Sequence, residues 1–342
     1  MKFLIAGAGA IGGHIGAFLA RAGEDVTLFA RGPHLRAMQA SGLRVITPTE
    51  EFVVRPRIIG SLTEAGPTDV IFLGVKAHSL TGLAPQIAPL VGETTTVVST
   101  QNGIPWWYFQ TGAGALTGTR LESVDPGGVI AEAIDSRRVV GSLAYLSSEV
   151  PQPGVIRVVQ GNRLTLGEPD GTRSERIRRI SEALVKAGIK APATTQLRNE
   201  IWVKLLGNVA FNPISALTRA TLGQMASDPV VSKLVRNIME EVGAVANQLG
   251  LDLPVSPEQR LEGAAKIGAH KTSMLQDLEA GRPLELEAIV GAVLEVADKL
   301  GVPMPHTRAV YACTKLLEKA AASKSDASAA NSAERVASTL GR

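Results

Sequence analysis

The spacing of hydrophobic and polar residues divides the chain into two halves. In the first half, short apolar runs such as residues 3–6 and 69–75 are each followed by an amphipathic segment with a helical period. Strands that alternate with helices in this way form a parallel sheet with helices on its faces. From about Gln196 onward, apolar residues recur only at the three- and four-residue spacing of helices. The sequence therefore predicts an α/β domain over residues 1–195 and an all-helical domain over residues 196–322, with a cleft between them.

The boundaries of the other predicted elements follow from the same patterns. The remaining strands of the first half are expected at residues 25–29, 43–46, 52–54 and 95–100. Between residues 129 and 166, turn signals at Pro153-Gly154 and Gly161-Asn162 separate short strands, which predicts antiparallel hairpins. The predicted helices lie at residues 174–187, 197–217, 229–249, 257–268, 284–300 and 307–322. Residues 323–342 are rich in Ala and Ser, and we expect a loose or solvated helical tail there.

The first apolar run leads directly into the sequence GAGAIG, and an amphipathic segment follows at once. A glycine-rich turn between a strand and a helix places a pyrophosphate at the N-terminus of that helix. The spacing assigns the tight turn to Gly7, close approach of the backbone to phosphate to Gly9, and helix–strand packing to Gly12. A glycine-rich turn that binds nothing is the alternative. We expect a Rossmann-type dinucleotide site whose turn residues are Gly7, Ala8, Gly9, Ala10, Ile11 and Gly12.

The residue after the second strand bears on the choice of cofactor. Folds that bind NAD carry Asp or Glu there, hydrogen-bonded to the ribose 2′-hydroxyl. This chain has Ala30-Arg31-Gly32 instead, with no carboxylate. Arginine at this point pairs with a 2′-phosphate, so the sequence favours NADP(H) over NAD(H). The alternative is that Arg31 is an ordinary solvated surface residue.

Further polar residues follow the ends of the later strands. The run 69–75 ends at Lys76, with His78 close behind, and the run 95–100 ends at Gln101-Asn102-Gly103. Strand C-termini in open α/β sheets face the ligand crevice, so Lys76, His78 and Asn102 are candidates for contacts with cofactor or substrate. Each of the three also has a plainer interpretation, as part of a turn or a helix start.

An aromatic segment, Trp106-Trp107-Tyr108-Phe109, follows closely in a region rich in Gly and Thr over residues 111–119. Such a cluster forms either a small core beneath a long loop or the apolar wall of a pocket, and both interpretations remain open here.

In the helical half, three polar residues stand out against apolar neighbours. Lys204, Asn208 and Asn212 are spaced at i, i+4 and i+8, which places them on one face of a helix. Polar groups in an apolar setting need partners, because burying them unpaired is costly. A structural network between helices is one interpretation. A row facing the substrate, with the lysine as proton donor, is the other.

Composition and charge argue against several classes of partner and of covalent cross-link. A formal net charge of +3 and the lack of a long basic run with interleaved aromatics argue against nucleic acid as a partner. The single cysteine, Cys313, excludes an intrachain disulfide and fits a reducing compartment. No signal peptide and no apolar run long enough for a bilayer are visible, so no membrane partner is expected. We expect a cytoplasmic enzyme for a small-molecule substrate, without a metal site, and a homodimer on general grounds alone.

Taken together, these motifs resemble the ketopantoate reductase family over residues 1 to about 322. The resemblance rests on the glycine turn, Arg31, Lys76, the QNG sequence at Asn102, the Lys-x-x-x-Asn-x-x-x-Asn-Pro helix, and SMLQD from Ser273 followed by Glu285. The SMLQD segment is much more specific than the glycine motif. The resemblance implies an NADPH-dependent 2-oxoacid reductase that pairs a Rossmann domain with a helical domain like that of 6-phosphogluconate dehydrogenase.

The resemblance also implies roles for individual residues. Lys204 would donate a proton to the carbonyl oxygen as hydride reaches the carbon, and Glu285 would hold the substrate hydroxyl and orient the lysine. Asn102 would lie near the nicotinamide and Lys204. Arg31 and Lys76 would hold the 2′-phosphate end of NADPH. The residues hydrogen-bonded to the substrate would be Asn208, Asn212 and Ser273. Taken alone, Ser273 also fits a helix cap with Gln276, and Glu285 fits a solvated helix carboxylate.

One departure from the family pattern concerns the substrate. The segment between Asn102 and Gly141 is longer than in an ordinary member, and it carries the aromatic segment. An aromatic wall would change the preferred shape of the substrate and leave the hydride chemistry intact. The reaction predicted is therefore reduction of 2-dehydropantoate or a related 2-oxo acid. The alternatives are an NADP-dependent dehydrogenase acting on a different hydroxy acid or polyol, and a non-catalytic NADP(H)-binding sensor.

Overall fold

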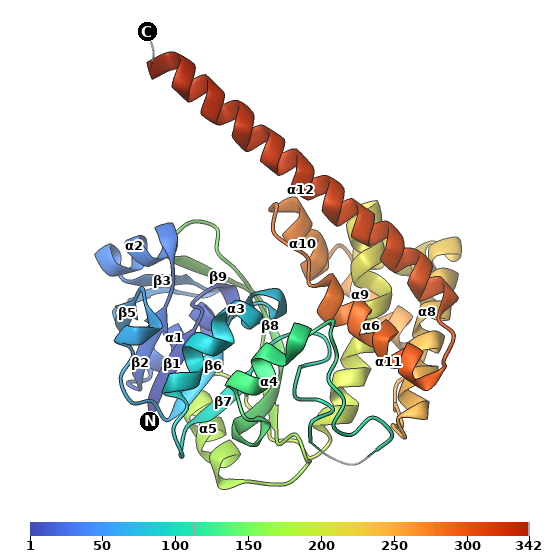
Figure 1. Cartoon of the computed structure of the whole chain (residues 1–342), viewed down its shortest axis with the longest axis horizontal. Helices are drawn as coiled ribbons and strands as arrows, with labels where there is room; N and C mark the ends of the chain where they lie inside the picture. The colour runs from blue at the N-terminus through green and yellow to red at the C-terminus, as the bar shows by residue number, and fades with distance from the viewer. Residues whose placement is uncertain (112–113, 341–342) are drawn as a thin grey trace. The chain divides into compact units, whose positions relative to one another are not determined.

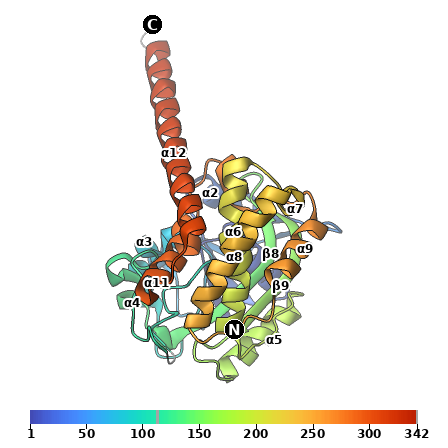
Figure 2. The same cartoon turned by 90° about the vertical axis from the view of Figure 1, so that its right-hand side faces the viewer.

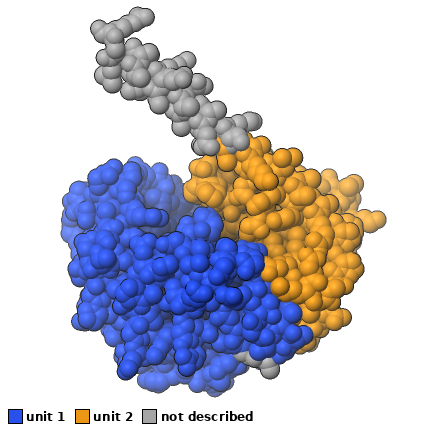
Figure 3. All heavy atoms as spheres, in the orientation of Figure 1, with its two compact units in different colours: residues 1–201 blue, residues 202–342 orange. Residues whose placement is uncertain are grey.

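The computed structural model describes residues 1–111 and 114–340, with side chains up to residue 322 (Figure 1). The chain forms two compact units, Met1–Ile201 and Trp202–Arg342 (Figure 3). The first unit contains a mixed sheet with helices packed against it, and the second is built from helices. This is the predicted fold class.

The sheet of the first unit has the strand order β4-β3-β9-β8-β7-β6-β1-β2-β5 over the residues that the structure describes. Neighbouring strands from β8 through to β5 are all parallel, as strand–helix alternation predicts. Two antiparallel pairs, β3 with β4 and β8 with β9, extend the sheet on the other side. The strands are β1 Lys2–Ala6, β2 Asp25–Phe29, β3 Leu43–Ile46, β4 Glu51–Val54, β5 Arg57–Ile59, β6 Val70–Leu73, β7 Thr96–Ser99, β8 Val139–Glu149 and β9 Val155–Gly167.

Helices cover the sheet because its parallel strands are apolar on both sides. Successive side chains of a strand point to opposite faces, so Phe3 and Ile5 of β1 face one layer. They share a buried core with Ile15 of α1 (Ala10–Arg21) and Ile180 of α5 (Glu175–Lys186). The other helices of this unit are α2 Gly32–Ser41, α3 Ala77–Ile87 and α4 Val129–Ala133, of which α2 and α4 were not expected from the sequence.

The hairpins predicted over residues 129–166 need correction. A single long hairpin, β8 with β9, replaces several short ones, and its turn contains Pro153-Gly154. The second turn predicted, at Gly161-Asn162, is wrong. Gly161 has φ +77° and lies inside β9, where the register shifts between Tyr145 and Ser147. An extra residue in one strand produces a bulge with the same glycine signal as a turn.

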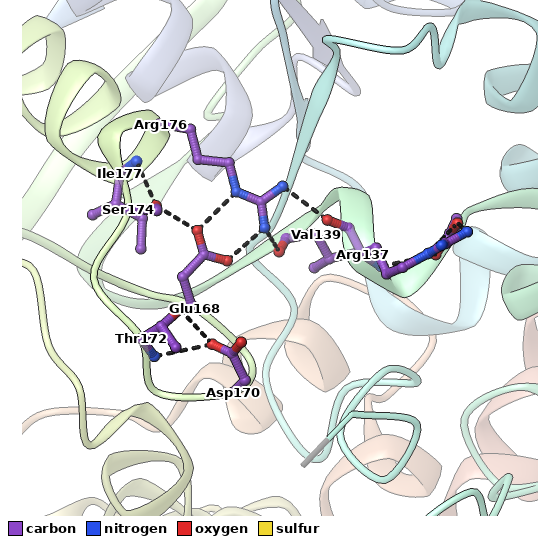
Figure 4. A network of polar contacts seen from close by, with 9 residues as sticks. Arg137, Val139, Glu168, Asp170, Thr172, Ser174, Arg176 and Ile177 are labelled. Atoms are coloured by element: carbon purple, nitrogen blue, oxygen red, sulfur yellow. Dashed lines mark hydrogen bonds and ion pairs between the residues drawn. The ribbon is translucent and has the colours of Figure 1, made fainter.

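A buried ion pair connects the end of β9 to the start of α5 (Figure 4). The carboxylate of Glu168 accepts hydrogen bonds from Arg176 Nε at 2.7 Å and from Ser174 Oγ at 2.5 Å. The Arg176 guanidinium also donates to the carbonyl oxygens of Arg137 and Val139, at the start of β8. With every oxygen of the buried carboxylate paired, this network fixes α5 against the hairpin.

The second unit contains the predicted helices with different boundaries, and also two short helices, Leu222–Ser227 and Ser273–Glu279, that were not expected (Figure 2). Its helices are α6 Leu197–Thr218, which begins within the first unit, α7 Leu222–Ser227, α8 Pro229–Gln248, α9 Pro257–Ile267, α10 Ser273–Glu279, α11 Ala292–Leu300 and α12 Pro305–Leu340. The helix predicted over 284–300 is instead a π-helical turn, Glu287–Gly291, that continues into α11. In the predicted tail, 323–342, the backbone continues α12 to Leu340, and the side chains lie outside the described residues.

Two searches of the described residues bear on function. No helix among them is both long and apolar enough to cross a membrane. No group of three or more His, Cys, Asp or Glu side chains among them is arranged to hold a metal ion.

Candidate functional site

The first unit brings one set of predicted residues to a single edge of its sheet. Strands β7, β6, β1 and β2 are adjacent and parallel, so their carboxyl ends lie side by side. The glycine turn follows β1, Arg31 follows β2, Lys76 follows β6 and Asn102 follows β7. Ligands of open α/β sheets bind at this edge, where the turns carry polar groups and helix N-termini.

The glycine turn has two of the properties that its spacing predicts, the tight turn at Gly7 and the close helix–strand packing at Gly12. Gly7 has φ +110°, a conformation that L-residues rarely adopt. A Cβ on Gly12 would lie 2.1 Å from the carbonyl oxygen of Gly7, so only glycine lets α1 approach the strand so closely. A Cβ on Gly9 would meet no atom within 4 Å, so no neighbour in the protein demands glycine there. Open space above Gly9 fits the close approach of a dinucleotide pyrophosphate, as the motif predicts.

The start of α1 also suits an anion. Gly9 is the N-cap residue and carries no side chain to bond the first backbone N–H groups of the helix. The first turn has no acidic residue that would repel a phosphate. Backbone N–H groups and the positive end of the helix dipole together bind anions.

Arg31 is exposed and is the N-cap residue of α2, immediately beyond β2. Lys76 is the partly buried N-cap residue of α3, and His78, two residues later, is exposed. Two basic side chains therefore flank the glycine turn at the ends of the two strands next to β1.

The aromatic segment lies inside the first unit. Trp107 and Tyr108 are almost completely buried, and Trp107 Nε1 donates to Ser99 Oγ of β7 at 2.8 Å. The Arg198 guanidinium lies 4.0 Å from the centroid of the Tyr108 ring and donates to the Tyr108 carbonyl oxygen. These contacts support the packing interpretation for Trp107 and Tyr108. Within the adjoining loop 111–119, residues 112–113 lie outside the described part of the chain.

In the second unit, Glu285 lies near enough to Lys204 to act on its pKa, although 80 residues separate them in the sequence. Lys204 is partly buried on α6, between the buried residues Trp202 and Leu205, and Glu285 is 8% exposed. Burial lowers the pKa of Lys204 from 10.5 to about 8, and the nearby carboxylate of Glu285 opposes that shift. A lysine with this pKa is mostly protonated near neutral pH, yet it gives up its proton much more readily than a solvated lysine.

The two asparagines continue from Lys204 along α6. Asn208 is partly buried and Asn212 is 5% exposed, and both are surrounded along the helix by apolar residues such as Val209 and Phe211. The amides provide donors and acceptors in line with the ammonium group, at the four-residue spacing of one helix face.

Ser273 is the first residue of α10 and is exposed. Taken alone, it also fitted a helix cap, and that interpretation is wrong. The N-cap residue is Thr272, whose hydroxyl accepts from the backbone N–H of Leu275 at 3.2 Å. Thr272, not Ser273, therefore caps the start of α10.

Comparisons with known proteins agree over most of the chain. The family models "Ketopantoate reductase PanE/ApbA" and "Ketopantoate reductase PanE/ApbA C terminal" match residues 3–107 and 196–318. A curated 2-dehydropantoate 2-reductase from Mesorhizobium japonicum is 50% identical over 318 residues, which cover 93% of this chain and 98% of that protein. The chain belongs to the ketopantoate reductase family.

Solved structures of ketopantoate reductases have the same fold. A protein from Ralstonia solanacearum, provisionally described as a ketopantoate reductase, superposes with a TM-score of 0.88 at 40% identity, covering 92% of this chain and 97% of that one. A 2-dehydropantoate 2-reductase from Geobacter metallireducens gives a TM-score of 0.81 at 30% identity, covering 93% of this chain and all of that one. As a member of this family, the protein is an oxidoreductase that acts on CH–OH groups.

Sequence reasoning missed His34 of α2, which contacts the glycine turn. Its Nδ1 atom accepts from the backbone N–H of Gly154 at 2.9 Å, so the ring proton is on Nε2, 2.9 Å from the Ala8 carbonyl oxygen. His34 thereby joins the glycine turn to the turn of the β8–β9 hairpin. No sequence pattern marks it, because its two partners lie 26 and 120 residues away.

Sequence reasoning also treated Gln101 only as part of a turn and missed the contacts that its side chain makes. Its amide nitrogen donates to the carbonyl oxygens of Leu73 and Val75, at 2.8 and 2.9 Å. These bonds connect the ends of β6 and β7, one residue from Lys76 and one from Asn102. Among the described residues, no partner lies within hydrogen-bonding distance of its buried Oε1 atom. Such an acceptor, at the sheet edge formed by the carboxyl ends of the parallel strands, fits a hydrogen-bond donor on a ligand.

Proposed function

We propose that this ketopantoate reductase uses NADPH to reduce 2-dehydropantoate, or a closely related 2-oxo acid, to the 2-hydroxy acid. The observation that carries the proposal is that Lys204, on a largely apolar stretch of α6, lies near Glu285 and has its pKa lowered to about 8. An ammonium group whose pKa is lowered in this way, with a carboxylate nearby, is suited to proton transfer to a carbonyl oxygen at neutral pH.

The first unit would hold the cofactor. The backbone of residues 7–12 receives the pyrophosphate, and Arg31 and Lys76 bind the 2′-phosphate end. Asn102 would lie near the nicotinamide, with Gln101 fixing the turn that carries it. When bound, NADPH supplies the hydride for the carbonyl carbon.

The second unit would hold the 2-oxo acid and the proton. The Lys204 ammonium donates to the carbonyl oxygen, and the new O–H bond forms as the C–H bond forms at carbon. The same charge offsets the negative charge that develops on that oxygen. Glu285 accepts a hydrogen bond from the substrate hydroxyl and keeps the ammonium in place. Asn208, Asn212 and Ser273 bond the carboxylate and hydroxyl of the substrate.

The test removes each half of the pair. Lys204→Ala and Glu285→Ala should each lower kcat by about 100-fold or more, with NADPH affinity unchanged in a fluorescence titration. Lys266→Ala, which removes an exposed lysine of α9, is the control and should behave as wild type. Wild-type turnover in either active-site variant would exclude that residue as a catalytic group.

A substrate panel tests the reaction itself. NADPH oxidation should be fastest with 2-dehydropantoate among 2-oxo acids of different size. Faster NADP⁺ reduction with another hydroxy acid or a polyol would favour a dehydrogenase instead. Tight NADPH binding without turnover of any compound would favour a sensor. We further propose a cytoplasmic enzyme, supported by the single cysteine, and a homodimer, which a sedimentation measurement would test.

A further inference from the structure

One face of α12 contacts the chain on both sides of Glu285, through the backbone N–H of Leu284 and the side chain of Glu287. Tyr311, Lys315 and Glu318 are spaced at i, i+4 and i+7, so they share a helix face. Glu318 Oε1 accepts from the backbone N–H of Leu284 at 3.0 Å, one residue before Glu285. Tyr311 and Lys315 both contact the carboxylate of Glu287, two residues after it.

Two side chains of α12 donate hydrogen bonds to the carboxylate of Glu287. The Tyr311 hydroxyl lies 2.9 and 3.1 Å from the two carboxylate oxygens, and the Lys315 ammonium pairs with Oε1. Burial and the Glu287 carboxylate raise the pKa of Tyr311 to about 12, so this hydroxyl remains a donor throughout the working range of pH. Hydrogen bonds from a charged and a neutral donor together fix both oxygens of the carboxylate.

The local backbone is unusual at this point. Residues Glu287–Gly291 form a π-helical turn, a feature that often occurs at functional sites. A Cβ on Gly291 would lie 2.4 Å from Glu287 Oε2, so glycine makes room for the Glu287 carboxylate to fold back over its own turn. The π turn and the α12 contacts therefore fix the direction in which the chain leaves Glu285.

We propose that Tyr311, Lys315 and Glu318 are positioning residues that act through Glu285. This inference rests on the proposed function, because it concerns the residue assigned there to orient the lysine and hold the substrate hydroxyl. Anchoring at positions 284 and 287 leaves the Glu285 backbone little freedom, and a carboxylate that has to meet an ammonium group tolerates little displacement. The plainer alternative is that these contacts only attach α12 to the unit.

The experiment uses the full-length enzyme and compares Tyr311→Phe and Lys315→Met with wild type. Each variant should lower kcat by about tenfold, with KM for NADPH within about twofold of wild type. Lys315→Arg, which keeps the charge on Glu287, should restore most of the turnover. Lys299→Met is the matched control, because Lys299 forms a surface pair with Glu295 on α11, and its kcat should not change.

A double-mutant cycle separates positioning from attachment of α12. In the Glu285→Gln background, adding Tyr311→Phe should change kcat by less than about twofold, because the effect acts through the missing carboxylate. A loss that multiplies with that of Glu285→Gln would overturn the inference, as would wild-type kcat in both Tyr311→Phe and Lys315→Met. Wild-type kcat in Glu285→Gln itself would overturn the proposed role of Glu285, and this inference with it.

Discussion

The imidazole of His34 holds the glycine turn through the carbonyl oxygen of Ala8, at 2.9 Å from Nε2. Its other nitrogen accepts from Gly154 in the hairpin turn, so both ring nitrogens are occupied and the tautomer is fixed. Burial lowers the pKa of His34, and the bond to the Ala8 carbonyl opposes that shift. A neutral histidine whose two ring nitrogens are both hydrogen-bonded thus supports the glycine turn.

Replacement of His34 should therefore weaken cofactor binding without altering the chemistry. His34→Ala removes both bonds and should raise the Kd for NADPH by about tenfold, while kcat at saturating NADPH changes little. Titration of protein fluorescence with NADPH measures the first quantity. Gln39→Ala, an exposed residue on the same helix, is the control. A wild-type Kd in His34→Ala would show that the glycine turn keeps its shape without this support.

Arg31 provides a test of cofactor choice. Arg31→Ala should raise the Kd for NADPH by about 10- to 100-fold and leave NADH affinity nearly unchanged, because only NADPH carries the 2′-phosphate. Arg36→Ala, at an exposed position on α2, controls for the general loss of positive charge. An equal loss of affinity for both cofactors would show that Arg31 does not recognise the 2′-phosphate.

The pKa of Lys204 predicts how turnover depends on pH. The proton donor must be protonated, and its pKa is lowered to about 8, so kcat should fall as pH rises through about 8. Glu285 raises that pKa, so Glu285→Gln should move the alkaline limb to lower pH. Initial rates of NADPH oxidation, measured against pH for wild type and for Glu285→Gln, give the alkaline limb of each enzyme. A profile that stays flat up to about pH 10 would contradict proton donation by Lys204.

Acid stability should depend on His14. This residue is buried on α1, bonded to Ser148 Oγ at 2.8 Å, and burial lowers its pKa from 6.5 to about 4. The unfolded chain binds the proton more readily, so stability falls as pH drops from about 6.5 towards 4, by roughly 3 kcal/mol in total. Urea unfolding followed at several pH values measures the slope.

His14→Gln, which can still bond Ser148, is the comparison for that measurement. It should lose stability at neutral pH through imperfect packing and show a shallower dependence on pH. If wild type and variant have the same slope between pH 6.5 and 4, then His14 is not the group responsible.

Local patterns predicted much of the fold. Strand–glycine–helix spacing identified the β1–α1 turn, and apolar runs identified the buried parallel strands, because these features are set by residues close together in sequence. Helix α2 was missed because its single buried residue, Met38, leaves no apolar stripe to recognise. The bulge at Gly161 was mistaken for a turn, since both require a positive φ.

In the candidate site too, some residues could be predicted from local sequence and others could not. The four-residue spacing of Lys204, Asn208 and Asn212 is fixed by helix geometry, so one face could be predicted from sequence. Glu285 and Ser273 were identified only by resemblance to the family. The assigned roles of all these residues, and the domain limits 1–195 and 196–322, stay predictions.

By itself, the sequence determined the glycine turn, the polar row of α6 and much of the order of strands and helices, since each depends on contacts within a few residues. Only the tertiary structure decided which distant groups meet: His34 with Ala8 and Gly154, Glu285 with Lys204, and Tyr311 with Glu287. These long-range contacts depend on strand register and helix packing over tens of residues. They also set the burial that moves the pKa of Lys204 and His14, which no local pattern encodes.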